Sequence, residues 1–160
     1  MEMMDVMIQL LMAFLGTMGF GMMFRVKWDR LLLCSLGGLL SWAVFLAMGR
    51  CFPQEAPSYF FASVAVTIYA EILARVVKCP TTVFLVVSEV PLIPGGSLYR
   101  AMSSFMAQDY AAFSQQGFNT LIYAGAIAVG MLFPMSVFQL VRRTRELVEK
   151  EGEQLWARRR

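Results

Sequence analysis

Long apolar runs without charge alternate with short polar clusters along this chain. Residues 6–24 and 31–49 are two such runs, and residues 56–74 form a third run that only Glu71 interrupts. A helix rises about 1.5 Å per residue, so a hydrocarbon core about 30 Å thick requires about 20 apolar residues. Each of the three runs therefore predicts a transmembrane helix.

Two further runs complete the pattern. Residues 80–99 form the fourth, and residues 111–141 form the fifth, which is apolar enough to span only from about residue 117. A secretory signal peptide would begin with a basic region, whereas the residues before the first run are acidic, so we interpret this run as a retained helix. We expect an all-α integral membrane protein with about five transmembrane helices, whose transmembrane domain covers residues 1–141.

The basic residues predict the orientation, because positive charge concentrates in cytoplasmic loops. If the N-terminus lies outside, Arg50 and Arg100 are the basic residues outside, and the other twelve of the 14 lie in the cytoplasm. The predicted topology is N-out/C-in. Residues 142–160 then form a basic cytoplasmic helical tail, so the net charge of +3 is explained without a nucleic-acid partner.

Composition agrees with a membrane protein and excludes several kinds of chemistry. The chain is 58% hydrophobic and 16% charged, with a mean hydropathy of +0.60, whereas soluble domains are about 45–50% apolar and about 25% charged. It contains no histidine, which removes Ser-His-Asp catalysis and His-ligated metal sites. Cys34, Cys51 and Cys79 have no metal-binding spacing, and no nucleotide-binding motif appears. We therefore expect no enzyme activity, cofactor or metal.

The segment PLIPGG, residues 91–96, interrupts the fourth predicted helix. Pro91 and Pro94 lack an N–H group and clash with the preceding helical turn, and Gly95 and Gly96 do not support a helix. In lipid, backbone groups freed in this way need protein or water as partners. We therefore expect a discontinuous fourth helix at PLIPGG; a proline kink that only helps helices to pack is the alternative.

A helix that restarts after the two glycines places its N-terminus inside the membrane. We expect Ser97 to cap this helix, and the free N–H groups of its first turn suit a substrate carboxylate. Glycine at these positions would allow non-helical backbone angles and a close approach of the ligand. The predicted substrate-binding residues are Pro91, Pro94, Gly95, Gly96, Ser97 and Tyr99, the last as a source of a hydroxyl.

Two carboxylates within the runs are candidates for proton coupling. A charge at mid-bilayer costs about 2.5–3.5 kcal/mol, so such groups are protonated, paired or exposed to a water-filled cavity. Glu71 lies four residues before Arg75, which makes an interfacial ion pair as plausible as a site role. Glu89 has no basic residue within one helical turn and is the more costly group.

The segment AEILARVVKCPTTVFLVVSEVPLIPGGSLYRAM, residues 70–102, resembles the signature region of the threonine/serine exporter family in its short subunit form. GFGMMFRV and GGLLSW fit the first two helices of that family, so the resemblance covers roughly residues 10–140. The positions that match the family pattern are Glu71, Arg75, Pro91, Pro94, Gly95, Gly96 and Tyr99. Glu89 departs from it, since the pattern has an apolar residue there. The resemblance therefore favours Glu71 over Glu89 for proton coupling.

The resemblance implies one membrane subunit of a two-component exporter in the cell inner or plasma membrane, with a longer membrane subunit of the same family as partner. The expected substrates are small carboxylate-bearing metabolites, either threonine and serine or dicarboxylates such as succinate. The proton gradient is the expected energy source. The alternative is a non-transporting membrane subunit that scaffolds a partner. A homo-oligomer and contacts with the lipid bilayer are further expectations.

Overall fold

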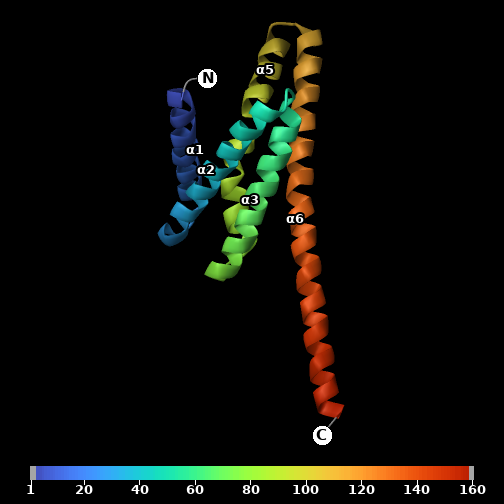
Figure 1. Ribbon diagram of the computed structural model, residues 1–160. Helices are drawn as coiled ribbons and strands as arrows, with labels where there is room; N and C mark the ends of the chain where they lie inside the picture. Colours follow the sequence, from blue (N-terminus) through green and yellow to red (C-terminus); the bar gives the residue numbers. More distant parts are fainter. Residues whose placement is uncertain (1–2, 159–160) are drawn as a thin grey trace.

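The computed structural model describes residues 3–158, with side chains described as far as residue 144 (Figure 1). This part of the chain is helical, without strands. Its elements are α1 (Met3–Met23), α2 (Trp28–Cys51), α3 (Glu55–Val77), α4 (Thr81–Ser88), the short 3₁₀ helix η1 (Val90–Leu92), α5 (Gly95–Met106) and α6 (Tyr110–Arg158). The prediction of an all-α protein is confirmed.

Among the residues that the structure describes, four helices are long and apolar enough to cross a membrane: α1, α2, α3 and the part of α6 from Tyr110 to Thr144. The segment Thr81–Leu92 and α5 together form a fifth such unit, bent by 49° at the break between them. These helices pack in sequence, α1 against α2, α2 against α3 and α3 against α6, while α5 lies along the start of α6 (Figure 1). The structure thus contains four to five possible spans, in agreement with the predicted number of about five.

Small residues allow close approach between the helices. A Cβ added to Gly38 of α2 would collide with Thr17 of α1, and one added to Gly37 would lie 2.8 Å from the Ser88 Cβ of α4. On α6, a Cβ at Gly130 would lie 2.8 Å from the Phe60 carbonyl oxygen of α3. Membrane helices associate through such van der Waals contacts, because lipid is as apolar as their side chains.

Hydrogen bonds join α2 to both α4 and α3. The Ser88 hydroxyl donates to the Cys34 carbonyl oxygen of α2 at 3.0 Å, and the Tyr69 hydroxyl of α3 donates to the Leu33 carbonyl oxygen at 2.8 Å. Phe84 is fully buried in the same core cluster as Cys34. The α4 half of the bent span is therefore attached to packed helices, whereas the break itself is partly exposed, with Ile93 63% exposed.

The last helix runs without interruption from Tyr110 to Arg158. The predicted tail, residues 142–160, continues the backbone of this helix as far as the described residues extend, while its side chains from residue 145 and its last two residues lie outside them. The N-out/C-in orientation and the boundary at residue 142 stay predictions.

Candidate substrate and proton sites

The backbone leaves the α-helical path at the PLIPGG segment. After α4 ends at Ser88, residues Val90–Leu92 form a single 3₁₀ turn, and α5 begins only at Gly95. Pro91 and Pro94 supply no N–H group here, so the usual ladder of helical hydrogen bonds cannot continue. The first turn of α5 consequently begins within the bent span, next to the packed core residue Leu92.

The expected cap of α5 was wrong. The Leu98 N–H donates to the Pro94 carbonyl oxygen at 3.1 Å, so Pro94 and not Ser97 is the N-cap, and the helix starts three residues earlier than expected. Pro94 has no side-chain acceptor, and the α5 N-terminus has no side-chain cap. Ser97 instead lies in the first turn, almost fully buried, where its Oγ accepts a hydrogen bond from Arg100 Nη2 at 3.2 Å.

The backbone does not need glycine at positions 95 and 96 for the reason expected. Neither residue has a positive φ, because both already belong to the helix. A Cβ at Gly95 would meet no atom within 4 Å, and one at Gly96 would meet only Arg100 Nη1 at 3.7 Å. The two glycines therefore leave open space over an uncapped helix N-terminus, rather than permitting a strained turn.

Of the other predicted residues in this segment, Pro91 is half-buried, whereas Tyr99 is 75% exposed. The structure does not bring Tyr99 into the buried environment of Ser97. Arg100, which was not predicted as a site residue, lies over the first turn of α5 and within electrostatic reach of Tyr59 and Tyr123. Its i,i+3 spacing from Ser97 was the available sequence signal.

Glu89 lies at the break and is the buried carboxyl group of this region, with 8% exposure. Its Oε1 lies 2.8 Å from Ser63 Oγ of α3. Its Oε2 has no hydrogen-bond partner among the residues that the structure describes. Sequence reasoning missed Ser63, because 26 residues separate it from Glu89 and only the packing of α3 brings them together.

The Ser63 hydroxyl faces two acceptors. Its Oγ is 2.8 Å from Glu89 Oε1 and also 3.0 Å from the Ile127 carbonyl oxygen of α6. A hydroxyl has one hydrogen to donate. If Glu89 is ionised, Ser63 donates to Oε1; if Oε1 carries a proton, Glu89 donates to Ser63 and Ser63 donates to Ile127. The two arrangements differ by one proton and a rotated hydroxyl, so this cluster can gain or lose a proton without moving a helix.

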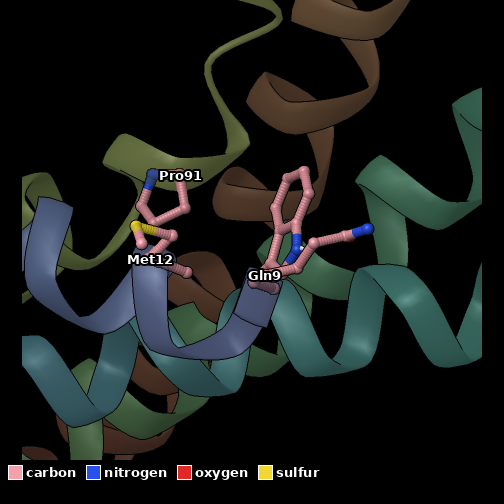
Figure 2. A pocket seen from close by; sticks show the side chains of 5 residues that line it. Gln9, Met12 and Pro91 are labelled. Atoms are coloured by element: carbon pink, nitrogen blue, oxygen red, sulfur yellow. Dashed lines mark hydrogen bonds between the residues drawn. The ribbon is translucent and has the colours of Figure 1, made fainter. Parts of the chain in front are cut away.

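A pocket of about 260 Å³ lies next to the break, between α1, α2 and Pro91 of η1. Figure 2 shows Pro91 facing Met12 across it, with Gln9 beside them. The Trp42 indole N–H donates to the Gln9 side-chain oxygen at 3.3 Å, and Ala13 completes the lining. Pro91 is thus the part of the predicted substrate site that lines this mainly apolar cavity.

A second, more polar pocket of about 430 Å³ lies where α3, α4 and α6 meet, and we call it the α3–α4–α6 pocket. Glu71 and Arg75 line it at the i,i+4 spacing seen in the sequence, and Arg75 Nη2 lies 3.6 Å from Glu71 Oε2. The Arg75 guanidinium also stacks 4.4 Å above the Phe138 ring of α6. The polar groups around this pocket are Glu71, Arg75, Thr81, Thr82, Gln139 and Arg142.

A sequence model described as Threonine/Serine exporter, ThrE, matches residues 9–137. The chain belongs to this threonine/serine exporter family. Members of the family are transporters, not enzymes, which agrees with the predicted class. The family and the apolar helices together make this exporter-type chain a multi-pass membrane protein. No solved structure matches the chain.

The family match includes most of the groups described above. In this exporter chain, the helix break, Ser63 and Glu89 lie within the matched residues, as does the Glu71–Arg75 pair. The α6 side of the α3–α4–α6 pocket extends beyond them, since Phe138, Gln139 and Arg142 follow the end of the match. That side of the pocket is therefore seen in the structure of this chain and is not part of the family match.

Proposed function

We propose that this chain is the short membrane subunit of a secondary exporter that moves small carboxylate-bearing metabolites out of the cell and takes its energy from the proton gradient. Threonine and serine are the first substrates to consider, and dicarboxylates such as succinate are the second. The partner is a longer membrane subunit of the same family, and the site of action is the inner or plasma membrane.

The observation that carries the proposal is the environment of Glu89. A carboxyl group 8% exposed, with one hydrogen-bonded oxygen and one oxygen without a partner among the described residues, has little that stabilises a permanent charge. Ionisable groups in membrane segments are rare and are typical of ion pathways and proton relays. The hydroxyl of Ser63 offers Glu89 a hydrogen-bond arrangement for each protonation state.

The geometry favours Glu89 over Glu71 for proton binding, in contrast to the preference that the family resemblance gave. Glu71 Oε2 already has the Arg75 guanidinium as a partner, with Arg75 Nη2 at 3.6 Å. The described residues place no such cation beside Glu89. We therefore propose Glu89 as the proton site and Glu71 as one half of an ion pair with Arg75.

The first turn of α5 is the proposed place for the substrate carboxylate near the break. The Gly95 N–H donates to the Ile93 carbonyl oxygen at 2.6 Å, whereas the N–H groups of Gly96 and Ser97 precede the first helical bond, from Leu98 to Pro94, and no side chain caps them. The Arg100 guanidinium lies over the same turn and adds a full positive charge. Helix N-termini with an adjacent arginine bind carboxylates through charge-assisted hydrogen bonds.

The test is efflux of threonine, serine and succinate from loaded vesicles that contain this chain and its partner, with and without an inward proton gradient. Glu89→Gln keeps the shape of the side chain but cannot titrate, so the gradient should no longer accelerate efflux. Asp29→Asn, which removes the charge of an exposed carboxylate outside the proposed sites, is the control and should keep the acceleration. Efflux that stays coupled in Glu89→Gln would refute the proton site. Efflux by the partner alone, at the full rate, would favour the scaffolding role instead.

A further inference from the structure

The α3–α4–α6 pocket brings groups of opposite charge together from three helices. Arg75 and Glu71 come from the end of α3, Thr81 and Thr82 from the start of α4, and Arg142 from α6. Its volume of about 430 Å³ lies within the range of about 300–1,000 Å³ that is usual for small-molecule sites. The charge distribution predicts this end of the bundle to be cytoplasmic, where an exporter receives its substrate.

The cationic side of the pocket is held in place by packing. Arg75 is positioned by Glu71 at 3.6 Å and by the Phe138 ring at 4.4 Å, an arrangement that fixes a guanidinium without using all its donors. Arg142 follows Phe138 by four residues and lies on the same face of α6. The N-terminus of α4, which has Pro80 as N-cap and no side-chain cap, adds partial positive charge beside them. Together, the two guanidinium groups and the α4 N-terminus could bind one carboxylate group.

The anionic side is Glu71, whose side chain is 15% exposed. A primary ammonium group can bind this carboxylate while a carboxylate of the same molecule binds Arg75 and Arg142. A second carboxylate in that place would meet Glu71 with like charge in a partly dehydrated pocket, which is strongly unfavourable. A pocket with this charge pattern would therefore favour an amino acid over a dicarboxylate of similar size.

We propose that the α3–α4–α6 pocket is an entry site for an α-amino acid in its zwitterionic form, with Glu71 binding the ammonium group and Arg142 with Arg75 binding the carboxylate. The inference rests on the proposed export function and adds a second substrate-binding site to the transport route. The entire α4 helix, about 12 Å long at eight residues, separates this pocket from the helix break at Glu89. The substrate would thus bind at the start of α4 before it reaches the break.

The chain contains its own reporter for this site. Cys79 lines the pocket and is partly exposed, Cys51 is exposed at the end of α2, and Cys34 is fully buried. In membranes that contain the complete exporter, the rate at which N-ethylmaleimide, which crosses membranes, alkylates each cysteine can be measured by mass spectrometry. Saturating L-threonine or L-serine should slow the alkylation of Cys79 at least fivefold and leave Cys51 unchanged. Succinate at the same concentration should slow it less than twofold.

Matched variants test the roles of the two charged sides. Arg142→Gln should raise the threonine concentration that gives half-protection at least tenfold, whereas Arg143→Gln removes the same charge from a residue outside the pocket and should change it less than twofold. Glu71→Gln should abolish the preference, so that succinate protects as well as threonine does. These outcomes together support the assignment.

Three results overturn it: no protection of Cys79 at threonine concentrations that saturate efflux, equal protection by succinate in the unmodified chain, or equal slowing at Cys51. The proposed function fails separately. Threonine efflux without protection of Cys79 would refute the entry site and support the export function. Protection of Cys79 without efflux of any substrate would support the binding site and refute the export function.

Discussion

The contact between α3 and α6 can be tested with a single methyl group at Gly130. In Gly130→Ala, the new Cβ would lie 2.8 Å from the Phe60 carbonyl oxygen and 3.0 Å from Ser63 Cβ. Favourable contacts between carbon atoms occur at about 3.5–4.0 Å. The backbone carbonyl cannot rotate away, so α6 must move from α3 by roughly 0.5–1 Å. Such overpacking costs about 1–3 kcal/mol.

Gly125→Ala is the matched control, because Gly125 also lies on α6 and a Cβ there would meet no atom within 4 Å. Both substitutions gain about 1 kcal/mol in helix propensity, so this contribution cancels in the comparison. We expect Gly130→Ala to be less stable than Gly125→Ala by about 1–3 kcal/mol, which is roughly a 5- to 150-fold difference in the unfolding equilibrium.

The assay is reversible unfolding of the purified chain in mixed micelles by added SDS, followed by circular dichroism. Displacement of α6 should also lengthen the 3.0 Å contact between Ser63 and the Ile127 carbonyl. The pH dependence of efflux should therefore change in Gly130→Ala and not in Gly125→Ala. Equal stability of the two variants would refute the close helix contact on which the Glu89 cluster depends.

Two further predictions concern the orientation and the helix break. In intact cells an impermeant maleimide should label Cys51 and not Cys79, and the reverse pattern would invert the predicted topology. Gly96→Val should reduce efflux per assembled complex at least tenfold while the protein level stays within twofold, because the added Cβ meets only Arg100 at 3.7 Å and lies over the open first turn of α5. A loss of assembly in step with efflux would instead indicate a packing role for this glycine.

Local sequence patterns were sufficient for much of the fold. The lengths of the apolar runs predicted the helices, since a membrane span needs a minimum number of apolar residues. Glu71 and Arg75 are placed together by helical spacing alone, which is a property of neighbouring turns.

The groups that depend on tertiary packing could not be predicted in this way. The pairing of Ser63 with Glu89 requires α3 and the break to meet, and the contact of Ser63 with Ile127 requires α6 as a third element. Arg142 reaches the α3–α4–α6 pocket only because α6 lies against the end of α3. The start of α5 depended on the backbone angles of Pro94, whose carbonyl oxygen accepts the first helical hydrogen bond three residues before Ser97.

Because α6 continues as one helix well beyond its contact with α3, through Pro134, a small tilt at that contact would become a larger displacement at its far end. This helix touches α3 closely at Gly130 and continues as one helix to Arg158, a distance of about 42 Å at 1.5 Å per residue. A tilt of about 5° about the Gly130 contact would carry its far end about 4 Å sideways. A small shift of α6 beside Glu89 would in this way become a displacement as large as a side chain at the C-terminal end of α6.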